Sequence, residues 1–86
     1  MLRVEGDSMI DAGILPGDTV LVERGRTPRN GDIVIACVDA AWTMKFFYKD
    51  AKGIRLEPAN KKFETIRPKR GLTVEGVVSS VIRKLV

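Results

Sequence analysis

The sequence predicts a mainly β fold, one small, curled and mostly antiparallel β domain with a single short helical turn near its start. Gly, Pro and Asn-Gly turn signals recur so often along the 86 residues that a long helix has no room. The segments between these signals are rich in β-branched and aromatic residues, which favour strands. A chain of this length holds one hydrophobic core, so residues 1–86 are expected to form one domain.

The predicted strands follow one another with short connections. In chain order they are Leu2–Glu5, Thr19–Glu23, Asp32–Asp39, Trp42–Tyr48, Ile54–Leu56 and Thr73–Val86. The segments 39–42 and 50–53 are short enough to close hairpins, which make the neighbouring strands antiparallel. A sheet of this kind is expected to curl or half close on itself.

The composition is that of a chain that folds in water, with 44% hydrophobic and 30% charged residues. The longest apolar run, Ile33–Val38, is far shorter than the roughly 20 residues that span a bilayer. The first residues include acids where a secretory signal would be apolar, so no export is expected. The single cysteine, Cys37, cannot form a disulfide within the chain. We therefore expect a cytoplasmic protein without membrane contact.

The residue inventory excludes several chemistries. Without histidine and with one cysteine, the chain cannot build a zinc site or a histidine-based triad. No metal or cofactor is expected, and any catalysis must use Ser, Thr, Lys, Asp, Glu or Tyr. Charge is uneven, since residues 1–44 hold four basic and seven acidic groups and residues 45–86 hold eleven and four. A polyanion is therefore a candidate partner.

Ser8 is the first candidate for chemistry. A helical turn is predicted over Ser8–Gly13, with Asp7 or Ser8 as its N-cap and Gly13 as its stop. A serine at this point can expose its hydroxyl, and the free N–H groups of the first turn can stabilise a developing negative charge. The alternative is that Ser8 only caps the turn, which is the usual role of serine there.

Lys45 is the second candidate. Strand alternation puts Trp42, Met44, Phe46 and Tyr48 on one face and Thr43, Lys45 and Phe47 on the other. Burial among apolar neighbours lowers the pKa of a lysine, and a base near neutral pH needs a fall of about 3 units from roughly 10.4. The alternative is a solvated lysine on an open strand face. Together, Ser8 and Lys45 are the one nucleophile and base pair available, a Ser-Lys dyad.

Five segments carry a resemblance to a known family. They are Val4–Asp18, Asn30–Ala36, Thr43–Lys45, Leu56–Asn60, and Val74–Val78 with Val81–Arg83. In order and spacing they resemble the LexA repressor and UmuD family, the S24 peptidases. The resemblance implies that Ser8 is the nucleophile, that Lys45 takes its proton, and that the backbone N–H groups of Asp7 and Ser8 form the oxyanion hole. It also implies a curled antiparallel β domain, in agreement with the strand pattern.

The resemblance further implies how the whole protein works. Residues 1–86 match the C-terminal catalytic and dimerisation domain of a LexA-type SOS repressor, in which RecA filament stimulates cleavage of an upstream Ala-Gly bond. Two protomers would pair through the C-terminal strand, Thr73–Val86, and DNA would be bound only by an N-terminal domain. The one Ala-Gly pair here, Ala12–Gly13, belongs to the segment around Ser8. The chain is therefore expected to lack both the cleavage site and the DNA-binding domain.

Two other functions remain open from the sequence, a UmuD-like subunit and a nucleic-acid module, and a third, signal peptidase, does not fit. A processed UmuD-like subunit of a translesion DNA polymerase fits the same motifs. A signal peptidase shares the Ser and Lys chemistry but needs a membrane anchor that is not found. A non-enzymatic module for single-stranded nucleic acid would use the basic residues Lys61, Lys62, Arg67, Lys69 and Arg70 in a chain of pI 9.6. Against that module, Trp42, Phe46 and Tyr48 share one strand face, the usual arrangement of a core.

Overall fold

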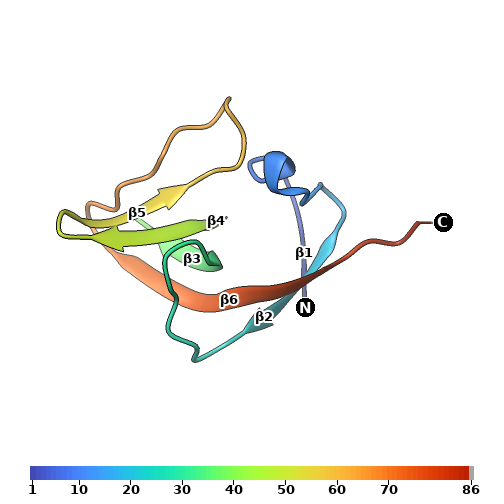
Figure 1. Ribbon diagram of the computed structural model, residues 1–86, viewed down its shortest axis with the longest axis horizontal. Coiled ribbons are helices and arrows are strands. Elements are labelled where there is room, and N and C mark those ends of the chain that lie inside the picture. The colour runs from blue at the N-terminus through green and yellow to red at the C-terminus, as the bar shows by residue number, and fades with distance from the viewer. Residues whose placement is uncertain (86) are drawn as a thin grey trace.

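The computed structural model describes residues 1–85 as one six-stranded antiparallel sheet with the strand order β1-β2-β6-β3-β4-β5. Its only helical element within those residues is one turn of 3₁₀ helix, η1 (Ile10–Ala12). The strands are β1 (Leu2–Arg3), β2 (Thr19–Glu23), β3 (Ile33–Val38), β4 (Ala41–Asp50), β5 (Gly53–Glu57) and β6 (Leu72–Ile82). The predicted mainly β, curled architecture is confirmed (Figure 1).

The curl of the sheet originates in β6, the long strand in its middle. Two register shifts interrupt its pairing, one opposite Ile35 and Ala36 of β3 and one opposite Leu21 and Val22 of β2. Such bulges bend a strand and increase its twist. Because β6 pairs with β2 on one side and β3 on the other, its bend turns the two halves of the sheet toward each other (Figure 1).

Gly76 lies at the tightest point of this bend. A Cβ atom added there would lie 2.4 Å from Cγ1 of Val22 and 2.8 Å from the backbone oxygen of Glu23. Both distances are shorter than van der Waals contact, and the second involves a backbone atom that cannot turn aside. The close approach of β2 to β6 therefore requires glycine at this position.

The two predicted hairpins are confirmed. Asp39 and Ala40 connect β3 to β4 with positive φ angles of 47° and 72°, as a two-residue hairpin turn requires. Ala51 and Lys52 connect β4 to β5. The predicted strand Thr19–Glu23 has the observed bounds, whereas Leu2–Glu5 shortens to Leu2–Arg3. The last strand ends at Ile82, and Val86 lies outside the described residues.

The C-terminal strand, through which two protomers are expected to pair, is an edge over only part of its length. β6 is a central strand over most of its length, because β3 covers it from Leu72 to Val77. Beyond Val77, β2 is its only partner among residues 1–85, with pairs as far as Thr19 and Ile82. The last residues of β6 therefore have a free side.

Two clusters of buried side chains form the core. The first surrounds β3 and consists of Val34, Ala36, Val38, Phe47, Leu56 and Val77. The second packs the N-terminal segment onto β2 and consists of Val4, Met9, Ile14 and Val20. The segment before β2 thus packs in a core of its own, and the candidate site includes Ser8, next to Met9 of this core.

The interpretation of the Trp42, Phe46 and Tyr48 face as core is only partly right. Phe46 packs against the second core cluster, whereas Trp42 at one end of this face is largely exposed. The buried face of β4 carries Lys45 and Phe47, because Lys45 lies opposite the fully buried Val34 in the register with β3. Trp42 is 63% exposed, and Phe46 and Tyr48 are half-buried. The Trp42 face is the more apolar of the two in sequence, so the alternation of β4 alone does not predict that Lys45 and Phe47 turn inward, and the pairing with β3 decides it.

The predicted helical turn forms, but its cap differs from the prediction. Gly13 ends η1 in the left-handed conformation with φ of 80°, as predicted. The N-cap is Met9, without a side-chain hydrogen bond, so neither Asp7 nor Ser8 caps the helix. The Ser8 hydroxyl therefore serves another contact. Within residues 1–85, no helix is long and apolar enough to cross a membrane.

Candidate active site

Ser8 and Lys45 meet although 37 positions separate them in the sequence. Lys45 Nζ donates a hydrogen bond to Ser8 Oγ at 2.9 Å. Ser8 belongs to the turn between β1 and η1, here called the Ser8 turn (residues 6–9), and Lys45 lies in the middle of β4. Lys45 is only 7% exposed, which excludes the alternative of a solvated lysine. The geometry thus joins a hydroxyl to a buried amine.

Lys45 is buried without an opposite charge. Nζ also donates hydrogen bonds to Thr43 Oγ1 and to the Met44 carbonyl, the latter at 3.1 Å. No carboxylate of residues 1–85 lies within 4.0 Å of it. Loss of water around the amine lowers the pKa of Lys45, because burial disfavours the charged form.

The three contacts of Nζ suit a protonated amine, which donates to all three oxygens, and they can also be kept by a neutral amine. A neutral lysine has two N–H groups and one lone pair. Thr43 Oγ1 and the Met44 carbonyl can accept the two N–H groups, which leaves the lone pair directed at the Ser8 hydroxyl. In that state Lys45 can accept the Ser8 proton. The sequence suggested no role for Thr43, although strand alternation placed it on the same face as Lys45.

The segment that follows β5 forms hydrogen bonds with the backbone of the Ser8 turn. The Ala59 N–H donates to the Ser8 carbonyl at 2.8 Å, and the Asp11 N–H donates to the Ala59 carbonyl at 2.7 Å. Asn60 Nδ2 donates to the Asp7 carbonyl at 2.8 Å. These contacts fix the backbone on both sides of Ser8.

A second attachment comes from the end of the chain. Arg83 donates through Nε and Nη2 to the Asp18 carboxylate at 2.8 and 2.7 Å, and through Nη2 to the Gly13 carbonyl at 2.7 Å. Asp18 is 3% exposed and also accepts the Leu15 N–H. The Arg83 hydrogen bonds hold the pKa of Asp18 below its usual value, and the Leu15 N–H adds to this effect. The chain after β6 is thereby tied to the turn after η1.

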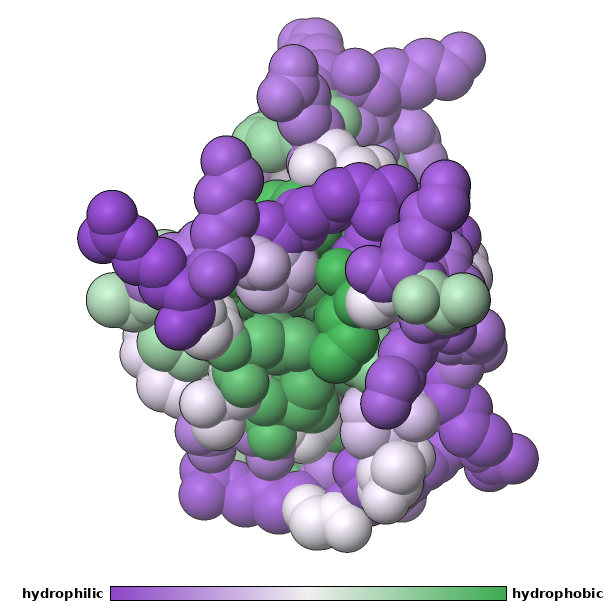
Figure 2. Space-filling model, turned by 90° about the vertical axis from the view of Figure 1, so that its left-hand side faces the viewer, coloured by the Kyte–Doolittle hydropathy of each residue, from purple (hydrophilic) through white to green (hydrophobic). Residues whose placement is uncertain are grey.

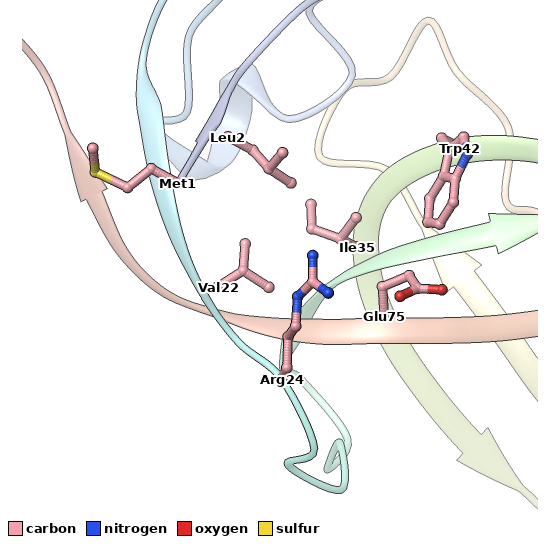
Figure 3. A pocket seen from close by; sticks show the side chains of 7 residues that line it. All are labelled: Met1, Leu2, Val22, Arg24, Ile35, Trp42 and Glu75. Carbon is pink, nitrogen blue, oxygen red and sulfur yellow. The ribbon is translucent and has the colours of Figure 1, made fainter.

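A groove leads from the Ser8 and Lys45 contact along the sheet. Three adjoining cavities of about 130, 180 and 380 Å³ form it, and Trp42 lines all three. The cavity beside Ser8 shares Thr43 and Met44 with the next one, which in turn shares Leu2 and Ile35 with the largest. Figure 3 shows the 380 Å³ cavity of this groove, with Arg24 and Glu75 among apolar side chains. The groove is mostly apolar and begins at the candidate site.

A family model described as Peptidase S24-like matches residues 1–79. The chain belongs to the Peptidase S24-like family. It is 48% identical over 85 residues to the LexA repressor of Acetivibrio thermocellus. The matched residues make up 99% of this chain and 40% of that protein. The LexA repressors of Desulfitobacterium hafniense and Caldicellulosiruptor saccharolyticus are 48% and 46% identical over the same length. The chain, a LexA-type S24 domain, spans about two fifths of the length of these relatives.

The backbone around Ser8 leaves donors available in this S24 domain. The N–H groups of Asp7 and Ser8 make no hydrogen bond within residues 1–85. The same part of the chain contains no group of three His, Cys, Asp or Glu side chains close enough to hold a metal ion. The residues predicted for the oxyanion hole therefore have free N–H groups, and their role stays a prediction.

The basic residues of the nucleic-acid alternative lie away from the groove. Lys61, Lys62, Arg67, Lys69 and Arg70 are exposed on the connection between β5 and β6. Figure 2 shows the face at the β4 and β5 side, where hydrophilic side chains surround an apolar hollow. The ring of Tyr48 is covered by the Arg55 guanidinium at 4.7 Å. Phe63, 43% exposed, is one aromatic ring among these basic residues, fewer than a stacking platform uses.

Proposed function

We propose that the chain is the autoproteolytic and dimerisation domain of a LexA-type SOS transcriptional repressor, spanning residues 1–86 and acting in the cytoplasm. Its reaction would be cleavage of an Ala-Gly bond upstream of the domain in the whole protein. The observation that carries the proposal is the 2.9 Å contact between Ser8 Oγ and Lys45 Nζ, with the amine buried and free of any carboxylate partner in residues 1–85.

The proposed reaction uses groups that the chain itself provides. Neutral Lys45 takes the Ser8 proton as Oγ attacks the alanine carbonyl carbon, and the N–H groups of Asp7 and Ser8 stabilise the resulting oxyanion. The protonated lysine then gives its proton to the glycine nitrogen as the peptide bond breaks. Water, activated by the same amine, hydrolyses the acyl ester and restores the Ser8 hydroxyl.

The groove is the proposed path of the substrate. Its apolar lining suits an extended peptide with apolar side chains around the scissile bond. β1 is an edge strand that borders the groove through Leu2, so its unpaired backbone groups can hold such a peptide as an added strand. This arrangement would bring the peptide carbonyl to Ser8.

The proposed partners act outside the groove. A second copy would pair with the free side of the end of β6, where Val81 and Ile82 are 41% and 48% exposed. Sedimentation that finds only 9.5 kDa monomer at micromolar concentration would contradict this pairing. RecA filament is the proposed activator, and DNA would be bound through another domain of the whole protein.

The processed UmuD-like subunit remains the second candidate. The three relatives compared above are all repressors, which favours the repressor. Reading the gene upstream of residue 1 decides between them, because a winged helix-turn-helix domain indicates a repressor and a short tail indicates a polymerase subunit.

Cleavage in trans tests the proposed chemistry. The chain is incubated with a separate polypeptide that carries an Ala-Gly site, and the fragments are identified by mass spectrometry. We expect slow cleavage, faster at about pH 10 than at about pH 7, because only neutral Lys45 accepts the proton. Ser8→Ala should abolish it, and so should Lys45→Arg, because guanidinium stays charged throughout this range.

Lys49→Arg is the matched control for the lysine. Lys49 lies on the same strand but is exposed, so its replacement should leave the rate unchanged. Equal cleavage by Lys45→Arg and wild type would exclude the dyad. A rate independent of pH would exclude the neutral lysine even if Ser8 proved essential.

A further inference from the structure

Asn60 forms a hydrogen bond with the peptide group that joins Asp7 to Ser8. Its Nδ2 donates to the Asp7 carbonyl at 2.8 Å, across 53 positions of sequence. Its Oδ1 accepts the Lys62 N–H at 3.0 Å, and the residue is 9% exposed. Because one backbone partner can only accept and the other can only donate, the orientation of the amide is fixed. Asn60 is thus a buried side chain whose amide nitrogen and oxygen each have a backbone partner, with the nitrogen directed at the Ser8 turn.

The direction of this hydrogen bond determines where the Ser8 N–H points. The Asp7 carbonyl and the Ser8 N–H belong to the same trans peptide, in which the two groups point in opposite directions. Asn60 draws the carbonyl toward the segment after β5, so the N–H faces away from that segment. The Ala59 N–H holds the next carbonyl, that of Ser8, from the same side. The peptide therefore cannot rotate without breaking the Asn60 contact.

The cavity beside Ser8 lies on the opposite side of the turn. It is lined by residues of β4 and by residues between positions 4 and 9, Ser8 among them, and by none from the segment after β5. The Ser8 N–H, which makes no hydrogen bond within residues 1–85, is thus directed to the side where Lys45 meets Ser8 Oγ. An oxyanion donor needs such a fixed direction, because preorganised donors stabilise developing charge without reorganising.

We propose that Asn60 is a positioning residue for the oxyanion hole, which aims the Ser8 N–H by holding the Asp7 carbonyl. The inference rests on the proposed function and assigns a role to the Leu56–Asn60 segment, which the dyad does not use. Asn60 touches no reacting atom. Its loss should weaken stabilisation of the transition state and leave substrate binding and the Lys45 base in place.

The test compares Asn60→Asp with Asn30→Asp. The first change keeps the size of the side chain and the acceptor for Lys62, but replaces the donor to Asp7 with a carboxylate oxygen. Asn30 is the matched control, because its amide also bridges two backbone groups, the Lys49 carbonyl at 3.2 Å and the Lys49 N–H at 2.7 Å, far from Ser8. Trans cleavage gives kcat and KM for each variant across the pH range.

We expect Asn60→Asp to lower kcat by about 100-fold, the typical effect of losing an oxyanion donor, with KM and the rise of rate with pH unchanged. Asn30→Asp should keep the wild-type kcat. A folded Asn60→Asp variant with kcat within about 3-fold of wild type overturns the proposal. If Asn60→Asp does not fold, Asn60→Ser, which is too short to reach Asp7, is judged by the same criterion.

A peptide boronic acid ending in boroalanine separates this proposal from the dyad. The boron forms a tetrahedral adduct with Ser8 Oγ, whose oxygen occupies the oxyanion position. Tight binding by wild type that weakens about 100-fold in Asn60→Asp, and stays unchanged in Asn30→Asp, supports the role of Asn60. Equal binding by wild type and Asn60→Asp overturns the role of Asn60 and leaves the dyad unaffected. Absence of an adduct in wild type overturns the proposed function and this inference with it.

Discussion

Two ends of the molecule are held together in different ways. At the hairpin end, β3, β4 and β5 are joined by two-residue turns, and each strand pairs with the next one in the chain. At the Ser8 end, residues 1–20 form local pairs such as Val4 with Asp18, and they are also held by partners 37 to 70 positions away, among them Lys45, Asn60 and Arg83. The hairpin end is specified by neighbours in sequence, whereas the Ser8 end also depends on contacts with distant segments.

This difference teaches where chemistry can be tuned. The long-range hydrogen bonds converge on the backbone around Ser8 and on the loop after η1, so changes there should alter reactivity as well as stability. Changes of equal size at the hairpin end should alter stability alone. The following expectations test this contrast, from the largest effect to the smallest.

Gly76→Ala should have the largest effect, because it acts on the bend that brings the two ends together. The added methyl group would meet Val22 and the Glu23 backbone, and because a backbone atom cannot turn aside, the cost lies at the upper end of overpacking, about 3 kcal/mol. Gly71→Ala is the control, since a Cβ there meets nothing within 4 Å. Urea unfolding measures both variants. Equal stability of the two would show that β2 and β6 can separate without cost.

A pair of matched valines separates stability from activity. Val20 belongs to the core of the Ser8 end and Val38 to that of the hairpin end, and they are 1% and 6% exposed. Each Val→Ala change should cost about 2 kcal/mol, from the lost apolar groups and the cavity left behind. Only Val20→Ala should also slow trans cleavage per folded molecule, because Val20 lines the groove. Equal rates for both variants would contradict the contrast between the two ends.

Lys45→Met should give the smallest effect, a gain in stability that depends on pH. Burial lowers the pKa of Lys45 in the folded state below the 10.5 of the unfolded chain, so the unfolded state binds more protons between these two values. Wild-type stability therefore rises with pH in that window. The advantage of Lys45→Met is full below the lowered pKa and disappears above pH 10.5.

The measurement is the difference in unfolding free energy between Lys45→Met and wild type as a function of pH, with Lys49→Met as the exposed control. The difference cancels the titration of the other groups. A difference that does not change with pH would mean that Lys45 is not desolvated in the folded chain.

Local patterns in the sequence were sufficient for much of this fold. Turn signals and β-branched segments located the hairpins and most of the strands, and Gly13 marked the end of η1, because these features depend on residues a few positions apart. The absence of histidine excluded a histidine-based triad, and the predicted places of Ser8 on a turn and of Lys45 on a strand face made them the candidate nucleophile and base. The resemblance to the family implies the same pair.

Only the tertiary structure decided the rest, because the remaining choices depend on contacts between distant segments. The pairing of Lys45 with Val34 determines which face of β4 is buried, and the curl of β6 brings that face to Ser8. The Ser8 hydroxyl therefore contacts Lys45 and does not cap the helix. Asn60 and Arg83 carry no local signal of their roles, since each acts on backbone or carboxylate groups more than 50 positions away. The sequence determined which residue types could do the chemistry, and the curled sheet determined which of them meet.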